Sequence, residues 1–74
     1  TDAELLAELK RLRKNLAAER EVPAYVIFSD RSLIDMAAKR PTSEIEFAGI
    51  FGVGKAKLRD FSKDFLALIA QFTK

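Results

Sequence analysis

Apolar residues recur with a helical period along the first part of the chain. Four leucines are spaced at i, i+4, i+7 and i+11, which places them in one stripe along an amphipathic helix over residues 2–21. Pro23 is expected to end this helix, because proline cannot donate a backbone hydrogen bond. We interpret the stripe as a surface of the core and nothing more; its members are Leu5, Leu9, Leu12 and Leu16.

The next segment, residues 22–28, is an apolar run that contains the single tyrosine, Tyr25. A lone strand without a partner is not stable, so we expect a buried, extended linker between helices. Two interpretations of Tyr25 stay open at this point. The ring is either a core residue with its hydroxyl bonded to the backbone, or an exposed surface that stacks on an unpaired nucleobase.

Two shorter helices are predicted after this linker, over residues 30–39 and 43–48. Ser29 or Asp30 caps the first of these helices. Ser43 and Glu46 have the spacing of a capping box at the start of the second. The residues expected to face the core are Leu33, Ile34, Met36 and Ala37 in the first helix and Ile45, Phe47 and Ala48 in the second.

The last part of the chain predicts two more helices, over residues 55–61 and 63–72, with Ser62 as a cap or a kink between them. Apolar residues at i, i+3, i+4 and i+7 give the final helix one buried face. No repeat or low-complexity segment interrupts the pattern. The expected fold class is therefore all-α, a compact five-helix bundle that forms a single domain over residues 1–74.

Composition limits the chemistry that such a bundle can perform. The chain has 74 residues, of which 49% are hydrophobic, and it contains no cysteine and no histidine. These absences remove disulfides, thiolate metal sites and the Ser-His-Asp and Cys-His catalytic arrangements. The acidic residues have no calcium-loop spacing. We therefore expect no catalytic residues, no metal and no cofactor in this domain.

Charge and length add two further expectations. The net charge of +2 and the pI of about 9.2 are only mildly basic. No apolar run approaches the ~20 residues of a membrane span, so no membrane association is expected. Because the chain starts at Thr1 and not at a methionine, we expect a piece excised from a larger protein.

The Gly-Val-Gly segment at residues 52–54 is the strongest candidate for a functional site. Glycine takes positive φ at no steric cost, so a tight hairpin can form there with its valine as an anchor. Backbone N–H groups at the start of the following helix form an anion site that a phosphate fits, and Lys55, Lys57 and Arg59 would add charge. The alternative is a turn that only lets two helices pack closely.

Other basic residues are weaker candidates. Lys10, Arg13 and Lys14 lie on one flank and the back of the first helix, and Lys39 and Arg40 end the helix over residues 30–39. The alternative for the first group is a solvated surface, and for the second a favourable interaction with the negative end of the helix dipole.

Several motifs together match a known family. They are Val22-Pro23-Ala24-Tyr25-Val26-Ile27-Phe28-Ser29-Asp30, Leu33-Ile34-Asp35-Met36-Ala37, Arg40-Pro41-Thr42 and Gly52-Val53-Gly54. Through these motifs nearly the whole chain resembles an HRDC domain, the helicase and RNase D C-terminal module, and most of all that of bacterial RecQ-type DNA helicases. The resemblance implies a five-helix bundle whose hairpin is similar to a helix-hairpin-helix DNA-binding motif. It also implies a domain that assists an ATP-dependent helicase core and is not itself an ATPase.

The resemblance implies weak binding of single-stranded or branched DNA, which tunes the substrate choice of a helicase in DNA repair and recombination. It further implies a monomeric domain of a bacterial, cytoplasmic protein that acts at the nucleoid. The expected DNA contacts, from the residues and the resemblance together, are Tyr25, Gly52, Val53, Gly54, Lys55, Lys57, Arg59, Lys10, Arg13, Lys14, Lys39 and Arg40.

A second hypothesis is a protein-interaction module that docks on the helicase core or on another partner. Some members of the family bind single-stranded DNA and others mainly contact protein. The chain also departs from the family pattern at Phe51, where proline often precedes the Gly-Val-Gly. This phenylalanine is either a core residue or an exposed surface. The residues that would carry protein docking are Phe51, Glu44 and Glu46.

Overall fold

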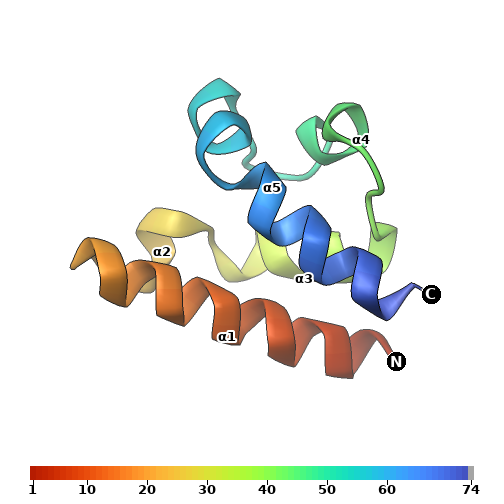
Figure 1. The fold of residues 1–74 in the computed structure, drawn as a ribbon, viewed down its shortest axis with the longest axis horizontal. Helices are drawn as coiled ribbons and strands as arrows, with labels where there is room; N and C mark the ends of the chain where they lie inside the picture. The colour runs from red at the N-terminus through yellow and green to blue at the C-terminus, as the bar shows by residue number, and fades with distance from the viewer. Residues whose placement is uncertain (74) are drawn as a thin grey trace.

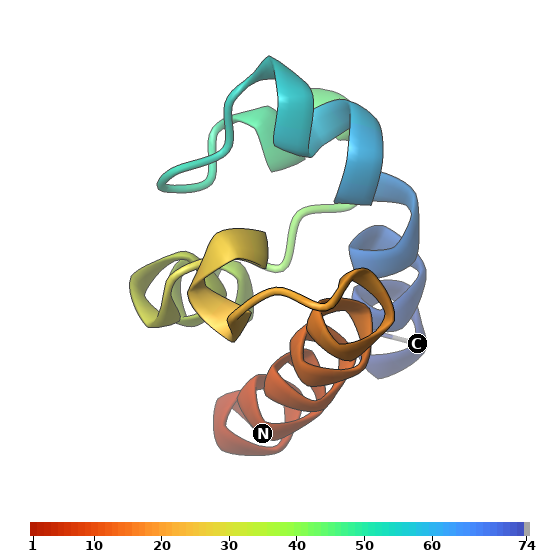
Figure 2. The ribbon, with the colours of Figure 1, turned by 90° about the vertical axis from the view of Figure 1, so that its left-hand side faces the viewer.

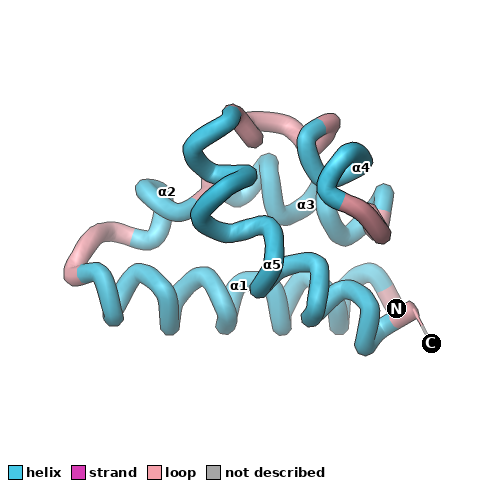
Figure 3. The backbone as a smooth tube through the Cα atoms, turned by 45° about the horizontal axis from the view of Figure 1, so that its top comes forward, coloured by secondary structure: helices cyan, strands magenta, loops and turns pink. Residues whose placement is uncertain are grey.

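Helix α1 (Asp2–Arg20) runs the length of the molecule, and the other helices lie across one side of it (Figure 1). The structure is a computed structural model that describes residues 1–73. In chain order the remaining helices are α2 (Ala24–Ile27), α3 (Asp30–Lys39), α4 (Glu44–Ala48) and α5 (Lys55–Phe72). The connections are short, and the longest, residues 49–54, joins α4 to α5 (Figure 3). No helix among the described residues is long and apolar enough to cross a membrane.

The all-α class and the total of five helices over residues 1–73 are confirmed, but two of the predicted elements are wrong. The linker over residues 22–28 is not extended throughout, because Ala24–Ile27 forms one helical turn, α2. Within this turn the Pro23 carbonyl accepts the Val26 N–H at 3.0 Å. A helical turn satisfies backbone groups locally, which an extended segment without a partner strand cannot do.

The second wrong element is the break at Ser62, since α5 continues through this residue as one helix. Ser62 is itself buried. Phe61, Phe65 and Ile69 stand at i, i+4 and i+8 and are all buried, so one apolar face crosses Ser62. Packing of this apolar face against the core stabilises the helix by more than the low helix propensity of Ser62 destabilises it.

Three phenylalanines form the centre of the core and join α4 and α5 to the α2–α3 junction. Phe28 lies edge-on to Phe65, with ring centroids 5.0 Å apart, and edge-on to Phe47 at 6.0 Å. All three rings are fully buried. The predicted leucine stripe of α1 supports this cluster, with Leu5, Leu9 and Leu16 buried and Leu12 partly buried.

Three residues of the predicted helices that were expected to face the core are exposed instead, and so is Val26 of the linker that was expected to be buried. The exposed fractions are 54% for Ile34 and 88% for Ile45, and Ala48 is exposed as well. In α3 the buried face is centred on Leu33, Met36 and Ala37, which leaves Ile34 on its flank. Helix α4 has five residues and buries only Phe47, because so short a helix presents a single side chain to the core.

Candidate nucleic-acid interface

The turn over residues 49–54 is fastened to α3 by two side chains. The Asp35 carboxylate accepts the Phe51 N–H at 2.9 Å, and the Ser32 hydroxyl donates to the Phe51 carbonyl at 2.6 Å. Gly52 follows with φ of 77°, a conformation that residues with a side chain rarely adopt. A Cβ atom at Gly52 would also lie 2.9 Å from the Ser32 oxygen. The first glycine of the motif is therefore required by both conformation and space.

The other two residues of the motif have different roles. Val53 is half-buried against the core, as predicted for the anchor of the hairpin, and its N–H donates to the Ile50 carbonyl at 3.1 Å. Gly54 is extended, with φ of −98°, and a Cβ atom there would meet nothing within 4 Å. As N-cap of α5 it supplies no side-chain hydrogen bond. The first N–H groups of α5 are thus left without a side-chain cap.

Tyr25 lies on α2 with 71% of its surface exposed, so the interpretation as a core tyrosine is wrong. Figure 2 shows α2 in the centre of one end of the molecule, between the C-terminal end of α1 and the tip of the turn. The buried residues of this segment are Ile27 and Phe28, which follow Tyr25 in the chain. The Tyr25 ring is therefore open to solvent, which leaves the interpretation as an exposed aromatic surface.

The basic residues at the start of α5 differ in their surroundings. Lys55 is exposed, and the Lys57 ammonium lies 5.4 Å from the centre of the Phe28 ring, next to the end of α2. Neither lysine has a carboxylate within 4.0 Å among residues 1–73. Arg59 instead donates to Asp60 at 3.0 Å, and this bond holds the pKa of the Asp60 carboxyl below its ordinary value.

Helix α1 contributes two exposed lysines and one nearly buried arginine. Lys10 and Lys14 are exposed and form no ion pair within the described chain. Arg13 is 12% exposed and contacts Asp30 at 2.8 Å and the Phe28 carbonyl at 3.0 Å. Its hydrogen bond and charge hold the pKa of Asp30 below the ordinary value, with a smaller effect from Lys10. Arg13 thus stabilises the fold through contacts with Asp30 and Phe28, and Lys10 lies close enough to Asp30 to lower its pKa as well.

Lys39 and Arg40 lie apart from this cluster, at the other end of α3. Lys39 pairs with Asp35 at 3.3 Å, and Arg40 pairs with Asp2 at 3.2 Å. The ten residues of α3 separate them from the α2–α3 junction by about 15 Å at 1.5 Å per residue. The predicted basic residues therefore form two groups. We call the predicted lysines of α1 and α5 that form no ion pair among residues 1–73 the group around α2, because Lys10 acts on Asp30 and Lys57 lies beside Phe28. The group comprises Lys10, Lys14, Lys55 and Lys57.

The residues assigned to protein docking lie on α4 and on the turn. Phe51 is 44% exposed and is not a core residue. Glu46 accepts the Thr42 N–H at 2.8 Å, while its own N–H donates to the Ser43 hydroxyl at 3.2 Å. The Ser43 half of the capping box is confirmed, and the Glu46 carboxylate caps Thr42 instead of Ser43. Glu44 is exposed.

Two residues of this region, Arg31 and Ser32, were not predicted from the sequence. The Arg31 guanidinium carbon lies 4.0 Å from the centre of the Phe51 ring, and Ser32 holds the Phe51 carbonyl. Both contacts join α3 to a turn far along the chain, so no local spacing indicates them. Among residues 1–73 no cluster of three metal-ligating side chains is present.

Comparison with known proteins places this arrangement in a family. The HRDC domain family matches residues 2–69. The ATP-dependent DNA helicase RecQ of Haemophilus influenzae is 44% identical over 70 residues, which make up 95% of this chain and 11% of that helicase. The ATP-dependent DNA helicase UvrD2 of Mycobacterium bovis is 43% identical over 68 residues, or 92% of this chain and 10% of that helicase. The chain spans about a tenth of the length of these relatives.

A solved structure agrees with the sequence match. D. radiodurans RecQ HRDC domain 3 has a TM-score of 0.95 to this chain at 27% sequence identity, covering 100% of this chain and 97% of that one. The likeness includes all five helices and the turn that joins α4 to α5, because it extends over the full length. From the family match and this fold together, the chain belongs to the HRDC domain family.

Proposed function

We propose that this chain is an accessory DNA-binding domain of a RecQ-type, ATP-dependent DNA helicase. It binds single-stranded or branched DNA weakly and tunes the substrate choice of the helicase in repair and recombination. The observation that carries the proposal is the exposed Tyr25 on α2, three residues before Phe28, whose ring lies 5.4 Å from the ammonium of Lys57, a lysine that forms no ion pair among residues 1–73. Membership of the HRDC family and the named helicase relatives support the assignment to a helicase.

The contacts follow from this geometry. A strand that crosses α2 meets Lys10 and Lys14 on one side and Lys55 and Lys57 on the other, and one base stacks on Tyr25. Phosphate contacts of this kind position the strand and carry no sequence preference. Because few phosphates are neutralised, binding is weak and sensitive to salt. The uncapped N–H groups at the start of α5 add a site for one phosphate oxygen.

The direct test is an NMR titration of the chain with a short single strand at low salt. We expect the amides of residues 52–57 and the ring of Tyr25 to shift, and Tyr25→Ala to weaken binding about tenfold. Lys63→Ala serves as the charge-matched control, since it removes one exposed lysine of α5 outside the group around α2. If neither residues 52–57 nor Tyr25 moved, the proposal would be wrong.

Protein docking is the second candidate, and one observation favours it. Ile45 is 88% exposed and stands between Glu44 and Glu46 on α4, so an apolar side chain is flanked by acidic ones. This surface suits a basic partner such as a segment of the helicase core. A change in unwinding by the full-length helicase on Glu46→Lys, with DNA affinity of this chain unchanged, would support docking over DNA binding.

A further inference from the structure

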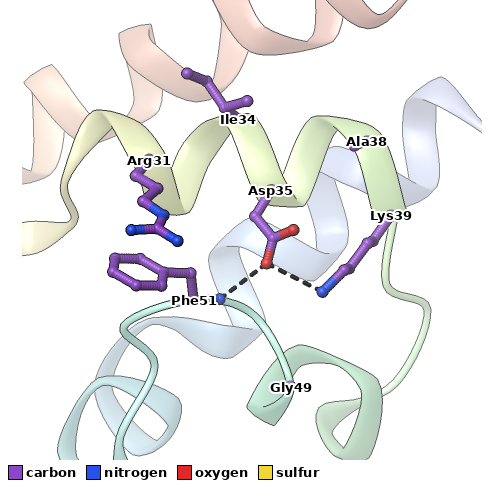
Figure 4. Close-up of a pocket in the computed structure, with 7 residues that line it drawn as sticks. All are labelled: Arg31, Ile34, Asp35, Ala38, Lys39, Gly49 and Phe51. Carbon is purple, nitrogen blue, oxygen red and sulfur yellow. Dashed lines mark hydrogen bonds and ion pairs between the residues drawn. The ribbon is translucent and has the colours of Figure 1, made fainter.

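A groove of about 470 Å³ lies between α3 and the turn, on the side of the molecule next to Phe51 (Figure 4). Its walls are Arg31, Ile34 and Ala38 of α3 and Gly49 and Phe51 of the turn. From the sequence, Phe51 was a departure from the family pattern and a candidate for protein docking. The structure gives this residue a specific setting that the proposed DNA contacts do not use.

Arg31 and Phe51 form an exposed planar pair at one end of the groove. The guanidinium carbon lies 4.0 Å from the ring centroid, and Figure 4 shows the guanidinium over the ring. Cation–π attraction favours this geometry. Phe51 is 44% exposed, and Arg31 is exposed as well. The pair therefore joins two π-bearing groups, one of which carries a positive charge.

The backbone of Phe51 is held before any ligand arrives. Its N–H donates to Asp35 at 2.9 Å, and its carbonyl accepts from Ser32 at 2.6 Å. Asp35 also binds the Lys39 ammonium at 3.3 Å, as the dashed lines of Figure 4 show. Since both backbone groups of Phe51 are fixed to α3, little backbone freedom is lost when a ligand stacks on the ring.

We propose that the Arg31–Phe51 pair, at one end of the groove, is a stacking site for one unpaired nucleobase. The inference rests on the proposed function, because the strand that presents this base is the one held around α2. Three features favour a nucleobase. Phe51 directly precedes the residues of the proposed phosphate contact, and stacking on aromatic and guanidinium planes suits every base. Arg31 also gives the groove a cation that forms no ion pair among residues 1–73, whereas Lys39 is paired with Asp35.

Tryptophan fluorescence provides a local test. The chain contains no tryptophan, so Phe51→Trp creates a single reporter in the groove. We expect a thymine single strand to quench its emission, while an abasic strand of equal length, which keeps the phosphates, leaves the emission nearly unchanged. Ile45→Trp, on exposed α4 outside the groove, is the matched control and should respond to neither strand.

Affinity provides the second readout. Anisotropy of a labelled strand should show that Phe51→Ala weakens binding of the thymine strand about tenfold, the range of one base–aromatic stack, and changes binding of the abasic strand much less. Arg31→Lys keeps the charge and loses the planar group, so it should resemble Phe51→Ala at low salt. Backbone NMR spectra confirm that each variant is folded.

The outcomes separate the two proposals. Binding by anisotropy with no change in the emission of the Phe51→Trp variant would overturn the stacking site and leave the proposed function intact. Absence of binding to any strand would overturn both. Quenching by the isolated helicase core and not by DNA would also overturn the stacking site and identify the groove as a protein-docking surface.

Discussion

Arg13 and Asp30 form an ion pair of 2.8 Å that joins the middle of α1 to the start of α3. The same guanidinium nitrogen donates to the Phe28 carbonyl at 3.0 Å, at the point where α2 ends. Asp30 is largely exposed, whereas the Arg13 side chain is 12% exposed. This arginine therefore lies inside the proposed DNA-binding surface but makes its contacts with the protein.

Replacement of Arg13 is expected to reduce stability first. Arg13→Ala leaves the Phe28 carbonyl without its charged donor, and we expect the free energy of unfolding to fall by about 2 kcal/mol. Urea denaturation measures this change. The neighbouring Lys14→Ala, which removes an exposed side chain, should change stability by less than about 0.5 kcal/mol. Full stability of Arg13→Ala together with lost DNA affinity would show that Arg13 is a DNA ligand after all.

The two glycines of the turn should respond differently to substitution. Gly52→Ala forces a side chain into a positive φ and against the Ser32 oxygen, so we expect a loss of about 1–2 kcal/mol or more. Gly54→Ser places a capping hydroxyl at an extended N-cap position with open space around it, and should stabilise the chain by a few tenths of a kcal/mol. Thermal unfolding compares the two, and equal effects at both positions would contradict the assigned roles.

Asp35 should make the attachment of the turn sensitive to acid. The hydrogen bond from the Phe51 N–H, helped by Lys39, holds the pKa of Asp35 below its ordinary value of 3.8. A folded-state pKa below the unfolded value means that the carboxylate stabilises the fold above about pH 4 and loses this effect as the pH falls through the folded value. The stability difference between the parent chain and Asp35→Asn should therefore be constant near neutral pH and vanish in acid.

A carboxyl NMR titration separates the two causes of this shift. Because the Phe51 N–H has the larger influence, Lys39→Met should raise the pKa of Asp35 only part of the way to 3.8. The Phe51 amide resonance should move with the same midpoint. If the pKa of Asp35 rose all the way to its ordinary value in Lys39→Met, the hydrogen bond from the Phe51 N–H would contribute nothing to the shift.

Salt dependence tests which lysines meet phosphates. If Lys10 and Lys55 each contact one phosphate of a single strand, Lys10→Ala and Lys55→Ala should each reduce the slope of log affinity against log salt by about 0.7. Lys63→Ala should leave the slope unchanged. Filter binding or anisotropy at several salt concentrations gives the slopes. Equal slopes for all three variants would exclude the proposed path of the strand.

The sequence predicted those parts of the fold that depend on one periodic face. The leucines of α1 and the caps of α3 and α4 follow from local spacing, and the structure has them. The errors at α2 and Ser62 have a different origin. Two features depend on how Phe28 and Phe65 meet in the core: whether residues 22–28 form a helical turn or an extended segment, and whether α5 breaks at Ser62. These two residues are far apart in the sequence, so no short stretch of the chain reveals their contact.

The candidate site was predictable to a similar extent. The Gly-Val-Gly motif indicated the turn, and the need for positive φ at Gly52 is a local property. The partners of the turn were not predictable, because Ser32 and Arg31 reach Phe51 from another helix. The basic residues were identified by their type alone, so the sequence could not tell Lys55 from Arg59. In the structure Arg59 forms an ion pair with Asp60, whereas Lys55 forms none among residues 1–73.

The contact between Ser32 and Gly52 has a consequence for how this surface can change over evolutionary time. The hydroxyl that holds the turn also occupies the volume that a side chain at position 52 would need. A larger residue at 52 becomes acceptable only after the serine is lost, and loss of the serine alone releases the turn. Substitutions at the two positions are therefore interdependent, and related sequences should retain or replace Ser32 and Gly52 as a pair.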